Sequence, residues 1–266
     1  MLERALTSLR LRALDARDRL GPGRDPLVPP RRLQFVGRGD FAETGDEFLD
    51  HFRDLAGLEP HERVLDVGCG IGRMARPLAG YLDSGRGTYD GFDVRADAIG
   101  WCRRRYGHSH PNFRFRVADL YNRRYHPGGA HAAGEYRFPY DEGSFDLVIA
   151  ASVYTHLLED EADHYLAESA RVLAAGGRLF ATFFLLDAVS RAKIATGEAG
   201  LPFLDPGEHV AVLSEDLPEE AVAYDAGWVA ERLAANGLEP VELRPGTWSG
   251  REDGLSLQDI VVARHA

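Results

Sequence analysis

Apolar stretches and helical stripes alternate along this chain, and the alternation predicts an α/β protein. Five segments have the apolar or alternating pattern of strands, the last two with a turn at their start: 64–67, 88–94, 113–119, 138–152 and 174–184. Four further segments have helical periodicity: 44–56, 74–79, 160–173 and 226–236. Two last strands, 238–243 and 258–264, are expected to form an antiparallel edge pair. We therefore expect a doubly wound, mostly parallel sheet of seven strands with helices on both faces.

The chain divides into an N-terminal arm, residues 1–34, and an α/β domain, residues 35–266. Residues 1–20 carry leucines and alanines on one helical stripe and arginines mostly off it, and a linker rich in Gly and Pro follows. The arm lacks the uninterrupted apolar segment of a targeting signal. We expect this helix to pack on its own domain or on a second copy in a homodimer rather than on a membrane. A solvated charged face is the simplest interpretation.

Composition limits the classes of function. The 266 residues are 44% hydrophobic and 27% charged, which is ordinary for a soluble globular protein. The net charge of −11 argues against a broad nucleic-acid surface, and no apolar run approaches the ~18 residues of a membrane span. The two cysteines, Cys69 and Cys102, have neither metal-site spacing nor the pattern of a disulfide framework. We expect free thiols, no bound metal and a cytoplasmic protein.

A glycine-rich segment between the first strand and the next helix carries the main chemical signal. The first strand breaks at Asp66 into three alternating glycines, Gly68, Gly70 and Gly72. Such a loop lets a ligand approach the backbone, and the helix N-terminus behind it favours a carboxylate or phosphate. A dinucleotide fingerprint needs a glycine where this chain has Arg73. Asp66 would disfavour a pyrophosphate and would attract an ammonium group.

At these residues the chain resembles the class I S-adenosylmethionine (SAM)-dependent methyltransferases. The resemblance covers roughly residues 60–266. It implies that SAM is the cofactor and that the loop from Asp66 through Gly72 holds its methionine end. A tight turn without a ligand is the alternative interpretation of the glycines.

Acidic residues end the second and third predicted strands. Asp93, with Val94 beside it, lies 25 residues beyond Gly68, near the spacing at which an acid in such folds binds ribose hydroxyls. Its alternative role is to cap the following helix. The resemblance implies that Asp119 binds the adenine amino group and that Leu120 packs on the ring. Asp119 is otherwise interpreted as a turn residue.

The fourth strand ends in Ser152 and Val153, which the doubly wound topology places at the ligand-binding edge of the sheet and which we expect to bind the cofactor. His156 follows a few residues later and is the nearest side chain of suitable pKa to act as a general base. Methyl transfer can also proceed by proximity alone, so a histidine that only holds the loop to the next helix is the alternative. No second acid or base is spaced to orient the ring.

Two segments depart from a minimal domain of this type. Residues 121–137 form an insertion beside the predicted adenine pocket, and residues 185–225 are expected to cap the substrate side of the sheet. Polar and aromatic residues of the insertion hint at a polar, acidic small-molecule substrate: Tyr121, Arg123, Arg124, Tyr125 and His126. Solvated loop residues explain the same pattern.

The sequence thus predicts a methyltransferase that moves a methyl group from SAM to a small-molecule nucleophile, with oxygen as the expected acceptor atom. A nicotinamide oxidoreductase would share the fold and Asp93. A protein that binds SAM without transferring the methyl group is the other alternative.

Overall fold

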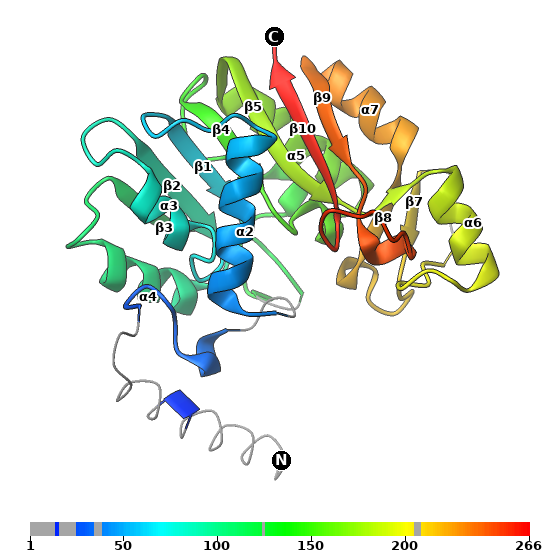
Figure 1. Ribbon diagram of the computed structural model, residues 1–266, viewed down its shortest axis with the longest axis horizontal. Helices are drawn as coiled ribbons and strands as arrows, with labels where there is room; N and C mark the ends of the chain where they lie inside the picture. Colours follow the sequence, from blue (N-terminus) through cyan, green and yellow to red (C-terminus); the bar gives the residue numbers. More distant parts are fainter. Residues whose placement is uncertain (1–13, 16–24, 35–38, 124–125, 205–208) are drawn as a thin grey trace.

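A seven-stranded sheet runs through the centre of the molecule in this computed structural model, which describes residues 14–15, 25–34, 39–123, 126–204 and 209–266 (Figure 1). Its strands are β1 (Arg63–Val67), β2 (Thr88–Asp93), β3 (Phe113–Val117), β4 (Phe145–Ala150), β5 (Leu173–Phe183), β9 (Leu238–Arg244) and β10 (Asp259–His265). They follow the order β3-β2-β1-β4-β5-β10-β9. The first five are parallel, and β10 runs antiparallel to both β5 and β9. The predicted fold class is confirmed.

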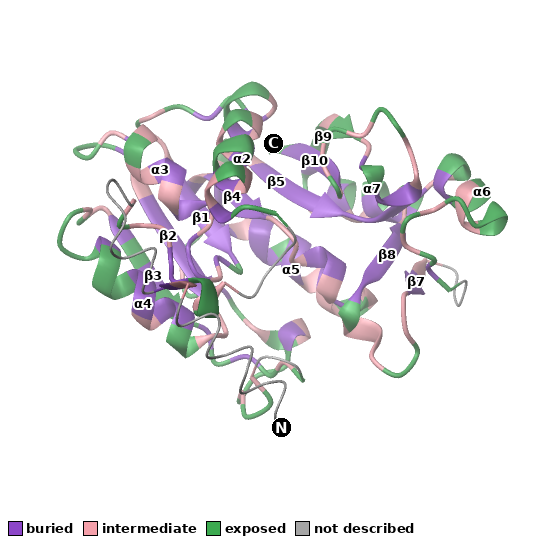
Figure 2. Cartoon of the chain, turned by 60° about the horizontal axis from the view of Figure 1, so that its bottom comes forward, coloured by how far each residue is buried: buried purple, intermediate pink, exposed green. Residues whose placement is uncertain are grey.

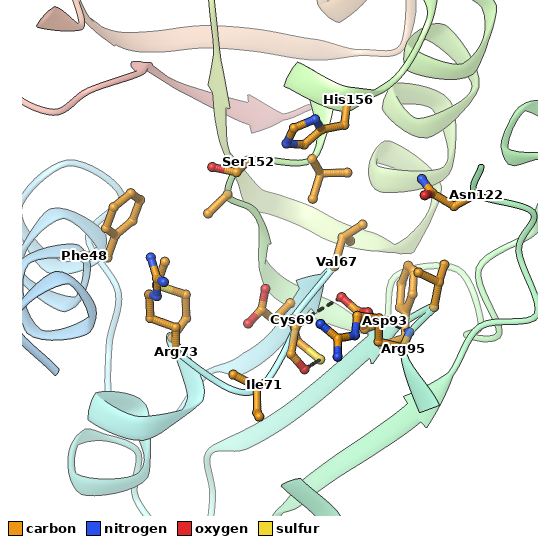
Figure 3. Close-up of a pocket in the computed structure, with 18 of the residues that line it drawn as sticks. Phe48, Val67, Cys69, Ile71, Arg73, Asp93, Arg95, Asn122, Ser152 and His156 are labelled. Carbon is orange, nitrogen blue, oxygen red and sulfur yellow. Dashed lines mark hydrogen bonds between the residues drawn. The ribbon is translucent and has the colours of Figure 1, made fainter. Parts of the chain in front are cut away.

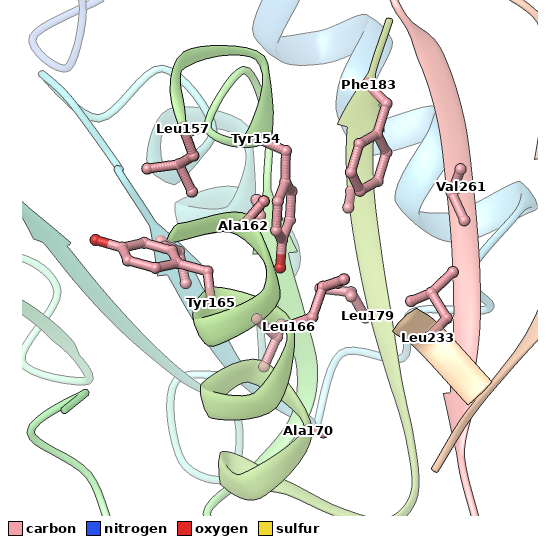
Figure 4. Packing of buried hydrophobic residues seen from close by; sticks show 14 of the residues in the cluster. Tyr154, Leu157, Ala162, Tyr165, Leu166, Ala170, Leu179, Phe183, Leu233 and Val261 are labelled. Carbon is pink, nitrogen blue, oxygen red and sulfur yellow. The ribbon is translucent and has the colours of Figure 1, made fainter. Parts of the chain in front are cut away.

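Helices cover both faces of the sheet because its strands bury side chains on both sides. On one face lie α2 (Phe41–Asp54), α3 (Ala75–Tyr81) and α4 (Ala96–Tyr106), whose apolar residues pack on alternate strand positions such as Val64 and Phe180. On the other face lie α5 (Glu159–Val172) and α7 (Ala226–Ala235). Figure 4 shows Tyr165 and Leu166 of α5 in this second core, together with Phe183 and Val261 of the sheet. The inner strands β1, β4 and β10 are mostly buried, whereas the edge strands β3 and β9 expose most of their residues (Figure 2).

Local sequence sets where these elements begin. The carboxylate of Asp40 accepts hydrogen bonds from the backbone N–H groups of Ala42 and Glu43, so α2 begins at Phe41, three residues before the expected start. The expected turn before β5 is a bulge inside that strand. Gly176 there adopts φ 73°, and the pairing with β4 shifts between Phe145 and Leu147.

Residues 185–225 contain a second, three-stranded sheet that the sequence pattern did not indicate. It is built from β6 (Leu185–Leu186), β7 (Val210–Val212) and β8 (Val222–Asp225) in the order β6-β8-β7, with α6 (Ala188–Thr196) between β6 and β7. Its core is a separate cluster in which Phe184, Phe203 and Trp248 are buried. Strands of two to four residues are too short to show an alternation of apolar and polar positions. For this reason the sequence pattern of this segment did not predict its strands.

Short 3-10 helices occupy several connections: η1 (Arg31–Leu33), η2 (Ala133–Glu135), η3 (Tyr154–His156), η4 (Pro218–Glu220) and η5 (Thr247–Ser249). The predicted N-terminal amphipathic helix lies almost wholly outside the described residues. Among the described residues, no helix has both the length and the apolar character needed to cross a membrane.

Candidate active site

The glycine loop leaves β1 with backbone conformations that favour glycine. Gly68 and Gly70 have φ values of 70° and 54°. A Cβ atom on Gly68 would lie 2.8 Å from a methyl group of Val153, whereas one on Gly70 would meet nothing within 4 Å. Gly68 therefore allows close packing against the end of β4, and Gly70 leaves open space above the loop. Gly72 instead faces α4, where a Cβ would come within 3.2 Å of the sulfur of Cys102.

Asp93, at the end of β2, binds the glycine loop directly. Its Oδ2 atom accepts a hydrogen bond from the backbone N–H of Gly70 at 2.9 Å, and its Oδ1 accepts one from the N–H of Arg95 at 2.8 Å. Burial raises the pKa of Asp93, and these two hydrogen bonds oppose the rise. Arg95, not Asp93, occupies the N-cap position of α4.

Asp66 is buried at the end of β1 and accepts a hydrogen bond from the hydroxyl of Tyr89 at 2.6 Å. Burial raises the pKa of Asp66 to about 7, while the Tyr89 hydrogen bond lowers it and the negative charge of Asp93 raises it further. Cys69 and Cys102 are both free and buried. Burial raises the pKa of each thiol, so neither has the character of a reactive thiolate.

The carboxyl end of β4 carries a strained residue in a polar network. Ser152 adopts φ 56°, and it is the only described residue other than glycine with positive φ. Its N–H donates to the hydroxyl of Thr182 at 2.7 Å, and its own hydroxyl donates to Oε1 of Gln258 at 2.9 Å. Thr182 donates to the same oxygen of Gln258 at 2.5 Å. Sequence reasoning missed Thr182 and Gln258, although each lies at the same edge of the sheet as Ser152.

His156 ends η3 and is held by a segment far away in the sequence. Its Nδ1 lies 3.0 Å from the backbone carbonyl oxygen of Glu219 in η4. Because a carbonyl oxygen can only accept a hydrogen bond, Nδ1 carries the ring proton and is the donor of this hydrogen bond. The hydroxyl of Tyr224 in β8 donates to the carbonyl oxygens of Tyr154 and Leu157, which fixes both ends of the η3 turn. The sequence offered no orienting group for His156, and the backbone of Glu219 is that group.

The segment after β3 places its predicted residues differently. Leu120 is buried and Asn122 lies two residues beyond it. The side chain of Asp119 is 61% exposed, and its Oδ1 accepts a hydrogen bond from the N–H of Ala130 at 3.2 Å. In this structure the Asp119 side chain therefore stabilises the backbone of the insertion.

Other residues of the insertion also make structural contacts. Arg123 donates to the carbonyl oxygen of Asp216, and Nδ1 of His126 donates to that of Leu120. Tyr121 is half exposed, whereas Arg124 and Tyr125 lie outside the described residues.

One cavity of about 240 Å³ joins these elements (Figure 3). Most of the predicted site residues line it: Asp66, Gly68, Gly70, Asp93, Val94, Leu120, Ser152, Val153 and His156. Gly72 and Asp119 do not line the cavity. Residues that the sequence did not assign to the site also line it, among them Phe41 and Phe48 of α2, Arg73, Arg95 and Asn122.

Arg73 lies beside the glycine loop, with its guanidinium 5.7 Å from the centre of the Phe41 ring. Burial lowers the pKa of Arg73, and the negative charge of Asp40 opposes this. In Figure 3 the side chains of Arg73 and Phe48 lie on one side of the cavity, and Asp93 and Arg95 lie on another. Among the described residues, no group of three or more His, Cys, Asp or Glu side chains could hold a metal ion.

Comparison with known proteins finds a match to a methyltransferase domain. Residues 64–177 match the family described as "Methyltransferase domain". The fatty-acid O-methyltransferase of Mycolicibacterium smegmatis is 33% identical over 140 residues, which are 53% of this chain and 42% of that protein. The chain thus spans less than half the length of this curated relative.

Solved structures share the fold at low sequence identity. The PH0226 protein of Pyrococcus horikoshii OT3 is 16% identical, with a TM-score of 0.58 over 94% of this chain and 99% of that chain. Magnesium protoporphyrin IX methyltransferase of Synechocystis PCC 6803, solved with bound SAM, is 18% identical, with a TM-score of 0.52 over 89% of each chain. The family match identifies residues 64–177 as similar to a methyltransferase domain, and the solved structures share the overall fold.

Proposed function

We propose that this protein transfers a methyl group from SAM to an oxygen atom of an apolar small molecule. The main support for this proposal is that the glycine loop, Asp93 and His156 line one cavity. A cofactor held at the loop and an acceptor beside His156 would therefore share the same cavity, as direct transfer requires.

The residues around the glycine loop fit SAM. Gly70 leaves open space where any side chain would stand, and the backbone there turns with positive φ. We propose that Asp66 attracts the ammonium of the methionine end and that Asp93 binds ribose hydroxyls. Val94 and Leu120 supply apolar contacts for the adenine ring, while Asp119 would need to leave Ala130 to reach it. When bound, SAM supplies a methyl group already attached to a good leaving group.

The walls on the acceptor side favour an apolar molecule. Phe41 and Phe48 of α2, together with Val153 and Leu157 after β4, line the cavity. The similarity to a fatty-acid O-methyltransferase points the same way and makes an apolar carboxylic acid the first acceptor to test. Arg73 contributes a positive charge among these apolar walls.

His156 has the tautomer that a general base needs. Since the Nδ1–H group donates a hydrogen bond to the backbone carbonyl oxygen of Glu219, the lone pair of the neutral ring is on Nε2. For a hydroxyl acceptor, we propose that Nε2 takes the hydroxyl proton as the oxygen takes the methyl group. A carboxylate acceptor is already ionised at neutral pH and needs no base.

Transfer of labelled methyl from SAM tests the proposal. The purified protein would be incubated with long-chain carboxylic acids and with phenols, and matched amines and hydrocarbons would serve as controls. Label in an ester or ether product, dependent on protein, is the expected result. Affinity for SAM without transfer to any oxygen compound would favour the binding-protein alternative, and affinity for NADH over SAM would favour the oxidoreductase.

Several predictions from the sequence stay part of this proposal. Residues 185–225 are proposed to cap the acceptor side, which is supported by the contacts of η4 with His156 and of Asp216 with Arg123. The division at residue 34, the homodimer through the N-terminal helix, the cytoplasmic location and the lack of nucleic-acid binding also stay predictions.

A further inference from the structure

A second cleft, of about 640 Å³, lies on the sheet outside the active-site cavity. Four arginines line it: Arg63 at the start of β1, Arg114 and Arg116 on β3, and Arg137 in the connection to β4. The protein as a whole carries a net charge of −11, so this gathering of cations contrasts with the rest of its surface. β3 is an edge strand of the large sheet, and Arg114 and Arg116 are exposed on it.

Carboxylates neutralise only part of this charge. Arg63 pairs with Asp146 at 2.7 Å, and Arg114 pairs with the buried Asp90 at 3.3 Å. The other acid lining the cleft is Asp141. Within the described residues, neither Arg116 nor Arg137 forms an ion pair. Four arginines thus face three carboxylates, those of Asp90, Asp141 and Asp146, and the cleft keeps a net positive charge.

Tyr140 adds a hydroxyl without a partner. Arg116 lies over its ring, with the guanidinium 5.3 Å from the ring centre. The Tyr140 hydroxyl is buried and forms no hydrogen bond among the described residues. A buried polar group without a partner is destabilising, and a ligand that accepts a hydrogen bond from it would remove that cost. Burial raises the pKa of this phenol, so it stays protonated and can donate.

The wall of the cleft is held firmly. Arg171 donates to the backbone carbonyl oxygens of Tyr140 and Phe138, and its guanidinium pairs with Glu168. Glu168 in turn accepts from the N–H of Phe138 at 2.6 Å. A ligand would therefore not have to order the segment, but it reaches the buried Tyr140 hydroxyl only if the side chains that cover it move aside.

We propose that this cleft binds the phosphate group of a small molecule, with Arg116, Arg137 and the Tyr140 hydroxyl as its donors. All three side chains donate hydrogen bonds, and the two arginines supply the charge that a phosphate dianion needs. The proposal does not depend on methyl transfer. The competing explanation is that arginines on β3 only prevent pairing of an exposed edge strand.

Calorimetry with pyrophosphate and inorganic phosphate tests the proposal, at an ionic strength held constant with sodium chloride. We expect saturable binding to the wild type at one site per chain. The double variant R116Q/R137Q should lose affinity by about tenfold or more, because two charge-assisted hydrogen bonds are removed. Tyr140→Phe deletes only the hydroxyl and should weaken binding by about threefold or more.

Arg104→Gln is the matched control, since Arg104 is exposed on α4 and does not line the cleft. It should leave the affinity within about twofold of the wild type. Thermal denaturation checks folding, and Tyr140→Phe remains informative if the double variant does not fold. The proposal is overturned if neither anion binds, if Arg104→Gln weakens binding as much as R116Q/R137Q, or if the cleft variants retain full affinity.

Discussion

Nδ1 of His156 lies 3.0 Å from the backbone carbonyl oxygen of Glu219, 63 residues further along the chain. The contact joins η3, beside the cavity, to the segment that carries the small three-stranded sheet. Because the acceptor is a main-chain atom, substitution of the Glu219 side chain does not remove it. The orientation of the histidine therefore depends on the fold of residues 209–225, and each prediction about catalysis has to separate this structural contact from chemistry.

His156→Asn should leave SAM affinity unchanged and lower turnover of a hydroxyl acceptor by about 100-fold, because the proton then has no base to accept it. The loss should shrink as pH rises and the hydroxyl ionises unaided. Turnover of a carboxylate acceptor by the same variant is the internal control and should change little. Turnover falling equally with both acceptors, or a loss that is independent of pH, would indicate a structural histidine.

Gly70→Ala should abolish most SAM binding without unfolding the protein, because the added methyl group would stand in the cofactor space. Gly57→Ala is the matched control. Gly57 has φ 62°, close to the 54° of Gly70, and a Cβ there also meets nothing within 4 Å. Both variants should lose about 1 kcal/mol of stability from backbone strain. Calorimetry with SAM should show loss of binding only for Gly70→Ala, and equal affinities would remove the loop from the site.

Asp93→Ala should weaken SAM binding by about 1–3 kcal/mol, since the N–H of Gly70 and the cofactor hydroxyls would both lose an acceptor. Asp119→Ala should weaken SAM binding by less than Asp93→Ala does. The Asp119 side chain is mostly exposed and already accepts a hydrogen bond from the N–H of Ala130. The measurement is the dissociation constant of SAM for each variant, with unfolding followed in parallel. A larger loss for Asp119→Ala would reverse the assignment of the two acids.

The buried Asp66 should make stability depend on pH. Its pKa is raised to about 7 in the folded protein, from an ordinary value near 4, so the folded state holds the proton more tightly than the unfolded state. Stability should therefore fall as pH rises from about 4 to 7 and then level off with respect to this group. Asp90, Asp93 and Asp259 have raised pKa values and act in the same direction.

Asp66→Asn separates this contribution, because the amide oxygen can still accept from Tyr89 without carrying charge. Urea unfolding of the variant and the wild type at pH 5 and pH 8 is the measurement. The stability that the variant gains over the wild type should be clearly larger at pH 8 than at pH 5, because most of the loss in the wild type falls between these two pH values. A pH dependence identical in both proteins would show that Asp66 is not protonated in this range.

Much of the fold could be predicted because the large sheet is buried on both faces, which produces long apolar runs such as that ending at Ala150. Gly68, Gly70 and Asp93 could be assigned to one site because carboxyl ends of parallel strands meet at one edge. Phe48 was indistinguishable from core before the cavity was known. Glu219 acts through its backbone, which leaves no trace in the residue type.

Gln258, which holds Ser152 and Thr182 together, directly precedes β10, and β10 lies between two strands that come earlier in the chain. During synthesis, β5 and β9 therefore leave the ribosome before the strand that must separate them. Until β10 arrives, β5 and β9 each expose an edge that could pair wrongly, either with each other or with another nascent chain. The polar network at Ser152 can close only after that insertion, so the active site should be among the last parts of the protein to form.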